Sequence, residues 1–369
     1  MTRKPFAVLA AALMLAGCSL PGERRRNESL SPEYTEPVAP EVTDVPEETT
    51  TAPPPETTLV TTSTGLAQET YEFAGNCILA NKGTPLVRAM EQYYYSDYIG
   101  QYLADSVNAF ADSIGDKVNI YLMCIPSSEE FYAPDAIRKQ YADQYDSTLD
   151  IYSKLYSAQG VFLNDFFEEH KAEYLYSRTD YHWQPLAAFY AARIFAEQAE
   201  VPFAEYDTYE RVDIENYLGA FYNVNGIYEL GKYPDTFTYY KPSNLKDCTF
   251  VYHDTYFSPG QEDVLFFEWM DVPSSYLMVG GADDVIIEAV TNVDNDRILV
   301  IFKDSYGNAL LPFLTHSFSR IYVCDNRYFD INSIDFCKEV HATDVLFALG
   351  TATYTSEDKV YDINGNRYQ

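Results

Sequence analysis

Two short segments of the chain hold a serine, a histidine and an aspartate in surroundings that suit nucleophilic catalysis. Ser305 follows an unbroken apolar run, 298–302, and opens an apolar segment at helical spacing, while Asp180 and His182 are two positions apart. A serine hydroxyl is a poor nucleophile unless an adjacent base removes its proton. A carboxylate bonded to an imidazole fixes its tautomer and favours its charged form. The sequence therefore predicts that His182 activates Ser305 and that Asp180 orients His182.

The spacing of the acid and the base indicates how they meet. In extended backbone the side chains of Asp180 and His182 project to the same side, and Pro185 disfavours helix in the residue before it. We therefore expect a non-helical segment here. The remaining histidines lack a neighbouring carboxylate in a turn, although one of them precedes Asp254, and are predicted to be structural: His170, His253, His316 and His341.

The Ser305 segment also permits a structural interpretation. The β-branched run 298–302 is typical of a strand buried on both faces of a parallel sheet, and open α/β sheets place their chemistry at the carboxyl ends of such strands. Asp304 or Ser305 is also suited to cap the following helix, and caps are far commoner than nucleophiles. The presence of His182 in the second segment favours the catalytic interpretation.

The pattern of strands and helices predicts the scaffold that must position these residues. Buried strands are predicted at 118–125, 298–302, 320–325 and 345–349, and helices at 93–114, 149–158, 186–194 and 331–340. This alternation indicates an α/β domain of three layers. Between about 201 and 290 short Tyr- and Phe-rich pieces are separated by Gly, Pro, Asn and Asp, at 237–240, 249–252, 264–267 and 276–279. We interpret this segment as a β-rich insertion packed beside the α/β core.

The N-terminus has the features of a targeting segment. Arg3 and Lys4 are followed by an apolar stretch, 6–15, that is too short to span a bilayer. The run LAGC at 15–18 resembles a bacterial lipobox, in which Cys18 is diacylated and becomes the first mature residue. The alternative is an ordinary signal peptide with an incidental cysteine. We predict a lipoprotein signal peptide over 1–18 and an extracytoplasmic protein, lipid-anchored to the outer face of the cytoplasmic membrane.

Residues 19–66 are rich in Pro, Thr and Glu. Such a segment lacks the apolar residues that offset ordering entropy, so it is predicted to be a disordered tether. At roughly 3 Å per residue it would extend on the order of 100 Å, which suits a wall-spanning position in a Gram-positive envelope. The basic run 24–26 is interpreted either as a contact to anionic lipid headgroups or as an incidental cluster.

Composition excludes some classes of function. Lys and Arg number 25 against 56 Asp and Glu, a net charge of −31, which argues against nucleic acid as a partner because phosphate contacts need basic surface. Of the 6 cysteines, those after Cys18 show no CxxC or metal-type spacing, and their odd number argues against a disulfide scaffold. We predict no metal and no cofactor. The acidic stretches 294–296 and 362–366 do not match a twelve-residue calcium loop, so solvated turns are expected there.

The two motifs in this order carry a family resemblance. The run RTDYHW at 178–183, followed by KDSYGNALLPF at 303–313, resembles the DHHW family of Firmicutes, which is similar to the AlgX/AlgJ group of SGNH-hydrolase-like proteins. The resemblance covers about residue 71 to the C-terminus and implies one SGNH-like DHHW domain over 67–369. The implied fold is an SGNH-type three-layer α/β/α sandwich in permuted motif order, because the Ser segment follows the Asp-His segment.

The resemblance also implies an activity. In the AlgX/AlgJ relatives the matching aspartate, histidine and serine form a triad that moves acetyl groups onto exopolysaccharide, and these positions correspond to Asp180, His182 and Ser305. Such proteins often work beside a membrane-bound O-acyltransferase that supplies the acyl group. The chain departs from the pattern at Tyr181, where the family-naming motif has a first histidine, and at Lys303, where hydrolases of this superfamily carry glycine.

Four further residues are candidates for binding the substrate or the oxyanion. Gly281 and Gly219 are predicted to offer backbone N–H groups to the oxyanion, without a clear Asn partner, and Arg178 and Tyr176 are predicted to contact the substrate. A missing donor would cost roughly 2.7–4 kcal/mol of transition-state stabilisation.

Taken together, the sequence predicts a cell-surface O-acetyltransferase or esterase acting on an exopolysaccharide or cell-wall glycan through a Ser-His-Asp triad. The alternative is a non-catalytic surface lipoprotein that binds a glycan or a partner through aromatic side chains. Tyrosines are abundant between residues 217 and 240, and they are interpreted either as the lining of a sugar groove or as core residues.

Overall fold

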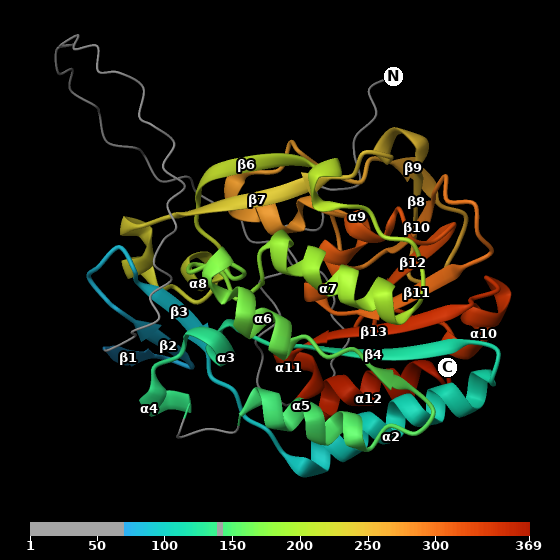
Figure 1. Cartoon of the computed structure of the whole chain (residues 1–369), viewed down its shortest axis with the longest axis horizontal. Coiled ribbons are helices and arrows are strands. Elements are labelled where there is room, and N and C mark those ends of the chain that lie inside the picture. The colour runs from blue at the N-terminus through green and yellow to red at the C-terminus, as the bar shows by residue number, and fades with distance from the viewer. Residues whose placement is uncertain (1–69, 139–142) are drawn as a thin grey trace, which may run out of the picture.

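A mixed eight-stranded sheet with the strand order β5-β4-β13-β11-β12-β10-β8-β9 runs through the middle of the molecule (Figure 1). The computed structural model describes residues 70–138 and 143–369. The predicted lipidation of Cys18 and the predicted tether over 19–66 lie outside the described residues. No helix in the described ranges is both long and apolar enough to cross a bilayer.

The centre of the sheet is parallel, as its sequence pattern predicts. β11 (Ile298–Lys303) lies between β12 (Arg320–Asp325) and β13 (Asp344–Gly350) and runs parallel to both. β4 (Asn119–Ile125) pairs with β13 in parallel. The carboxyl ends of these four strands therefore lie along one edge of the sheet.

Alternate side chains of β11 enter two different cores. Leu299 and Ile301 belong to a core that includes α7 (Pro185–Gln198). Val300 and Phe302 belong to the core on the opposite face, which also takes side chains from α2 (Asp97–Ile114), α10 (Ser333–Glu339) and α12 (Glu357–Asn366). Figure 1 shows α7 on one side of the sheet and α2 and α12 on the other. The predicted three-layer α/β/α sandwich is confirmed.

The β-rich segment is only in part a separate unit. β6 (Glu210–Tyr217) and β7 (Asp235–Lys241) form a two-stranded ribbon. The next three strands continue the central sheet instead of forming a lobe: β8 (Thr249–His253), β9 (Gln261–Asp263) and β10 (Ile286–Val290). β10 pairs with β12 in the antiparallel direction, and β8 pairs with β10 and β9 in the same way. The central sheet is therefore parallel in the middle and antiparallel at this end.

Two of the strand predictions in this segment are wrong. Residues 264–267 form only an isolated bridge, between Phe266 and Val279. Tyr276 lies in the 3₁₀ helix η7 (Val272–Met278), which has Pro273 in its first turn. Short apolar runs do not distinguish a strand from a buried helical turn, and proline at the start of a helix would have been the better signal here.

The predicted helices form, with some boundaries displaced. α2 begins at Asp97, after residue 93, and ends at Ile114; the C-cap residue Gly115 has a φ of 92°, which suits a residue without Cβ. α5 (Gln144–Ser153) begins earlier than predicted because the Asp143 carboxylate caps it. The short remaining helices are α3 (Ser128–Tyr132), α4 (Asp135–Arg138), α6 (Asn164–His170), α8 (Ala220–Asn223), α9 (Leu311–Leu314) and α11 (Thr351–Tyr354). The other 3₁₀ helices are η3 (Lys171–Glu173), η4 (Tyr206–Thr208), η5 (Tyr228–Lys232), η6 (Leu245–Asp247) and η8 (Ser305–Leu310).

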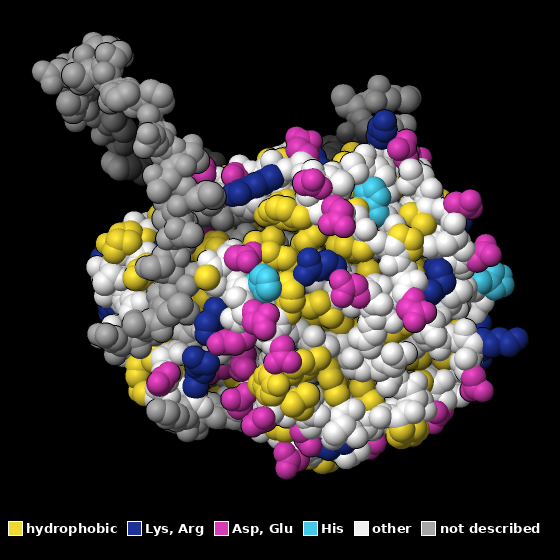
Figure 2. Space-filling view, viewed as in Figure 1, with side chains coloured by type: hydrophobic (Ala, Val, Ile, Leu, Met, Phe, Trp, Pro, Cys, Tyr) yellow, Lys and Arg dark blue, Asp and Glu magenta, His cyan; other side chains and the backbone are white. Residues whose placement is uncertain are grey.

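A three-stranded antiparallel sheet packs at one end of the molecule. It contains β1 (Tyr71–Ala74), β2 (Cys77–Ala80) and β3 (Arg88–Glu91). The remaining strand, β5 (Gln159–Gly160), is a short edge strand of the central sheet and not of this one. Acidic side chains are spread among basic and apolar ones over the face of the molecule in Figure 2. The surface thus reflects the acidic composition.

A network of ion pairs joins the carboxyl ends of β11 and β12. Lys303 Nζ lies 2.9 Å from Asp283 Oδ1 and 2.8 Å from Asp325 Oδ2, and Arg327 Nη2 lies 2.9 Å and 2.7 Å from the same two carboxylates. Burial would raise the pKa of Asp283, but Lys303 and Arg327 hold it below its ordinary value. A Cβ at Gly307 would lie 2.4 Å from Lys303 Cβ. A larger residue at position 307 would therefore collide with the Lys303 side chain.

Removing one partner from this network should destabilise the fold strongly. Asp325→Asn leaves Lys303 and Arg327 sharing a single carboxylate, and breaking a buried pair costs about 3–5 kcal/mol. We expect a loss of that size in the free energy of unfolding measured by urea denaturation. Asp294→Asn, in an exposed turn, is the matched control and should change stability by less than about 0.5 kcal/mol. Equal stability of the two variants would contradict this assignment.

Candidate active site

The structure separates the two roles that the sequence left open for Asp304 and Ser305. Asp304 caps η8, because its Oδ1 accepts a hydrogen bond from the Tyr306 N–H at 3.0 Å. Its Oδ2 accepts the Gly350 N–H at 2.8 Å, which ties the end of β11 to the end of β13. Ser305 therefore does not cap the helix, and its hydroxyl faces His182 at the carboxyl edge of the sheet.

The three residues predicted to form a triad lie in hydrogen-bond contact. His182 Nε2 is 2.8 Å from Ser305 Oγ, although 123 positions separate them in the sequence. His182 Nδ1 is 2.8 Å from Asp180 Oδ1, and both of these side chains are buried. With the Nδ1 proton directed to the carboxylate, Nε2 is left as the acceptor for the serine hydroxyl proton. This arrangement can generate an alkoxide-like nucleophile at Ser305.

The Asp180 carboxylate accepts four hydrogen bonds. Oδ1 takes the backbone and ring N–H groups of His182, and Oδ2 takes the Tyr217 hydroxyl at 2.7 Å and the Ala220 N–H at 2.8 Å. Burial would raise the pKa of Asp180, but His182 and Tyr217 outweigh it and hold that pKa below its ordinary value. The chain bends at Tyr181 and His182 instead of running extended. The contact thus arises from an Asx-type turn.

Asp235, the first residue of β7, fixes the segment that carries the acid and the base. Its Oδ2 accepts the backbone N–H groups of Arg178 and Thr179, both at 2.8 Å, and the Thr179 hydroxyl at 2.9 Å. Its Oδ1 accepts Arg178 Nε at 2.9 Å. The Arg178 guanidinium also donates to the carbonyls of Tyr233 and Pro234. The prediction that Arg178 binds substrate is therefore not supported, because this side chain holds the loop in place.

An aromatic ring that the sequence analysis missed supports the imidazole. The Tyr276 ring stacks on His182 with centroids 3.8 Å apart and planes at 9°. The Tyr276 hydroxyl lies 3.0 Å from the carbonyl oxygens of both Ser305 and Tyr306. Trp183 Nε1 donates to the same Tyr306 carbonyl at 3.0 Å. One tyrosine from η7 thus links the histidine segment to the serine segment.

The two glycines predicted to form an oxyanion hole have other roles. The Gly219 N–H donates to Thr179 Oγ1 at 3.1 Å, and a Cβ at Gly219 would lie 2.2 Å from Asp180 Oδ2. The Gly281 N–H donates to the Leu277 carbonyl at 3.1 Å. Neither amide points to an oxyanion, so both predictions are corrected. Gly219 instead allows the chain to pass close to the Asp180 carboxylate.

Most of the candidate sugar-binding tyrosines belong to the core. Tyr176 is fully buried and its hydroxyl donates to the Pro126 carbonyl at 2.5 Å, so its predicted contact with substrate is not supported. Tyr217, Tyr239 and Tyr240 are buried as well, whereas Tyr228 is exposed. Within the described residues no three His, Cys, Asp or Glu side chains form a group that could hold a metal ion.

Comparison with known proteins assigns the chain to a family. The model of the DHHW protein family matches residues 66–324. The chain belongs to the DHHW family. A crystal structure of a DHHW family protein from Eubacterium siraeum DSM 15702 has 35% sequence identity and a TM-score of 0.75, over 80% of this chain and 96% of that one.

The chain also resembles more distant solved structures, among which PatB1 shares its fold. Bacillus cereus PatB1, solved with a sulfonyl adduct, has 16% identity and a TM-score of 0.61, over 78% of this chain and 97% of that chain. The O-acetyltransferase domain of Pseudomonas putida AlgJ has 13% identity and a TM-score of 0.45, over 78% of this chain and 99% of that one. No curated protein matches the sequence. The likeness to PatB1 agrees with the three-layer α/β/α fold that the two motifs predicted.

The buried acids predict how stability depends on pH. Burial raises the pKa values of Glu91, Glu129 and Glu130 to about 7, so the folded state binds these protons more tightly and gains stability as pH falls from 8 to 5. The pKa values of Asp180 and Asp283 are lowered, so the stability they contribute is present above pH about 4 and lost below it. Urea midpoints should therefore peak near pH 5 and decline on both sides.

A single substitution checks the alkaline side of this profile. Glu129→Gln keeps an acceptor for the Gln144 amide, which donates to Glu129 Oε2 at 2.8 Å, but removes the titration. The variant should show a shallower loss of midpoint between pH 5 and 8 than the parent protein. A parent midpoint that rises steadily from pH 5 to 8 would contradict the assignment.

Proposed function

We propose that this DHHW protein is a cell-surface acyltransferase or esterase that moves O-acetyl groups on an exopolysaccharide or cell-wall glycan. The observation that carries the proposal is the unbroken chain of hydrogen bonds from Asp180 through His182 to Ser305, each 2.8 Å long. The likeness in fold to PatB1 is consistent with it.

In the first half-reaction Ser305 Oγ attacks the carbonyl carbon of an O-acetyl donor. His182 Nε2 takes the serine proton, and Asp180 stabilises the imidazolium that forms. The bond from the carbonyl carbon to the leaving oxygen then breaks, and His182 returns the proton to that oxygen. The acetyl group is left on Ser305 as an ester.

In the second half-reaction a hydroxyl group takes the acetyl group from Ser305. Its oxygen attacks the acyl carbonyl carbon, His182 takes its proton, and the bond to Ser305 Oγ breaks as the serine is reprotonated. A sugar hydroxyl gives a transferase, and water gives an esterase. The same three side chains serve both outcomes.

The oxyanion of each tetrahedral intermediate needs hydrogen-bond donors. The Ser305 N–H is at the first position of η8, where a helix leaves its amides unpaired. The Gly219 and Gly281 amides are already bonded within the protein. Since each missing donor costs roughly 2.7–4 kcal/mol, we expect slow turnover of simple esters.

The location of the reaction follows from the N-terminal segment. A lipid on Cys18 would anchor the chain to the outer face of the cytoplasmic membrane, and residues 19–66 would carry the domain toward the polymer. A membrane-bound O-acyltransferase is the partner that would present acyl groups on this side of the bilayer. This partner would be needed because the proposed site lies outside the cell, so an acyl group from the cytoplasm would have to be carried across the membrane.

Replacing the nucleophile tests the proposal directly. Ser305→Ala should reduce hydrolysis of 4-nitrophenyl acetate by at least about 10³-fold and abolish covalent labelling by a sulfonyl fluoride. Asp180→Asn should reduce hydrolysis by on the order of 10³–10⁴-fold, because it favours the wrong histidine tautomer. Circular dichroism should show that both variants remain folded.

The control for this test is Ser113→Ala, which removes an exposed hydroxyl on α2. It should retain parental activity and labelling. If Ser305→Ala hydrolyses the ester as fast as Ser113→Ala, the triad is not catalytic. Glycan retention by such an inactive protein would then favour the alternative of a non-catalytic surface lipoprotein.

A further inference from the structure

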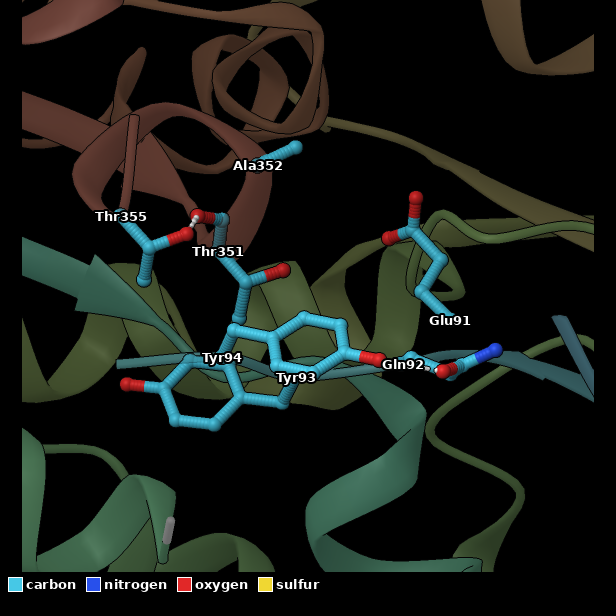
Figure 3. Close-up of a pocket in the computed structure, with 7 residues that line it drawn as sticks. All are labelled: Glu91, Gln92, Tyr93, Tyr94, Thr351, Ala352 and Thr355. Carbon is cyan, nitrogen blue, oxygen red and sulfur yellow. Dashed lines mark hydrogen bonds between the residues drawn. The ribbon is translucent and has the colours of Figure 1, made fainter. Parts of the chain in front are cut away.

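A cavity of about 230 Å³ opens where the chain leaves the carboxyl end of β13, and none of the three triad residues lines it. It lies between the end of β3 with the residues that follow it and the start of α11, and its polar lining comes from Glu91, Gln92, Tyr93, Tyr94, Thr351 and Thr355 (Figure 3). Pockets that enclose drug-sized ligands measure roughly 300–1,000 Å³. This smaller cavity suits one compact ring, such as a single sugar unit of a glycan.

The cavity shares its walls with the serine segment. Thr351 follows Gly350, whose N–H donates to Asp304 Oδ2 at 2.8 Å. A Cβ at Gly350 would lie 2.6 Å from the Tyr306 ring, so the start of α11 packs directly on the residue after Ser305. A ligand in the cavity would therefore lie at the same sheet edge as the triad.

Glu91 connects the cavity electrostatically to the triad. Its carboxyl group interacts with the charges of His182, Asp180 and Asp304, and also with Lys359 on α12. Burial raises the pKa of Glu91 to about 7, and His182 and Lys359 offset only part of that effect. The acid thus changes its protonation state in the neutral range, close to the base.

The Glu91 carboxyl group differs from the other two acids whose pKa burial raises to about 7. Among the described residues none forms a hydrogen bond or an ion pair with it, whereas Glu129 and Glu130 both accept bonds from Gln144. Figure 3 shows the carboxyl group turned away from the Tyr93 ring, on the side where Thr351 and Ala352 lie. Neither carboxyl oxygen is among the buried polar atoms that lack a partner, so solvent reaches the group. A sugar hydroxyl group could therefore take the place of water there.

We propose that this cavity binds the sugar whose hydroxyl group accepts the acyl group, and that Glu91 accepts a hydrogen bond from that sugar. The inference rests on the proposed function and specifies its acceptor site. A sugar ring presents several hydroxyl groups, and the lining of the cavity includes the Glu91 carboxyl group and the side chains of two threonines. The Tyr94 side chain, which is exposed, adds an aromatic surface at the rim.

The chemical consequence concerns the fate of the acyl group on Ser305. The sugar oxygen attacks the acyl carbonyl carbon, its proton passes to His182 Nε2, and the carbonyl bond to Ser305 Oγ breaks. Water can follow the same route without contacting Glu91. The ratio of transfer to hydrolysis therefore reports on the cavity, while hydrolysis itself reports on the triad.

The test measures that ratio with 4-nitrophenyl acetate as donor and methyl glycosides of glucose, galactose and N-acetylglucosamine as acceptors. Nitrophenol release gives total turnover, and mass spectrometry gives the acetylated sugar. Glu91→Gln should lower the ratio at least tenfold and raise the KM for the acceptor. Ala352→Trp, on an exposed position of α11, should lower the ratio similarly by filling the cavity. The control Glu339→Gln, exposed on α10, should match the parent.

A pH series adds a readout that a purely structural role would not change. The charged form of Glu91 accepts the sugar hydroxyl better, so the ratio should rise between pH 6 and 8 in the parent and stay flat in Glu91→Gln. The groups facing Glu91 are His182, Asp180, Asp304 and Lys359. Protonation of His182 affects transfer and hydrolysis alike, so it cancels in the ratio.

The outcomes separate this inference from the proposed function. If hydrolysis depends on Ser305 but Glu91→Gln and Ala352→Trp keep the parental ratio, the acceptor does not bind in the cavity. The same conclusion follows if none of the three glycosides is acetylated while hydrolysis still depends on Ser305. If Ser305→Ala hydrolyses the ester at the parental rate, the proposed function itself fails.

Discussion

The candidate site depends on one buried carboxylate. Asp180 accepts hydrogen bonds from its own turn, from the end of β6 and from the start of α8, so it joins three parts of the chain around the His182 ring. A buried charge is tolerated only when it is paired and hydrogen-bonded, and this requirement fixes the three parts relative to one another. The imidazole therefore has one orientation, in which Nε2 faces Ser305.

The central sheet positions Ser305, and the β-rich segment positions His182. The parallel strands fix Ser305, because β11 is buried on both faces and Asp304 ties its end to β13. The histidine is in a loop outside the sheet and needs support from elsewhere. Asp235 from the β6–β7 ribbon holds the loop backbone, and Tyr276 from η7 stacks on the imidazole. The segment between α7 and β11 thus holds His182 in position.

The sequence was sufficient for features encoded by local pattern. The strand at 298–302, the helix opened by Pro185 and the Asp-x-His spacing are all present in the structure, since each depends on neighbours along the chain. Features set by packing between distant segments were missed or misassigned. Tyr276 was placed in a strand, and the Gly219 and Gly281 amides were expected to be free because their acceptors, Thr179 Oγ1 and the Leu277 carbonyl, are defined only in the folded chain.

The pairing of acidic groups around the site distinguishes the structural carboxylates from Glu91, for which we propose a ligand. Asp283 and Asp325 are neutralised by Lys303 and Arg327, Asp235 is paired with Arg178, and Asp180 is bonded to His182. Asp180, Asp235 and Asp325 also accept backbone N–H groups, whereas within the described ranges Asp283 accepts bonds from side chains only. Glu91 is half-buried at the same sheet edge, and no described residue satisfies its carboxyl group. Burial raises the pKa of Glu91, and the charges of His182 and Lys359 offset only part of that effect. The stabilising partner of Glu91 is therefore best sought in the substrate.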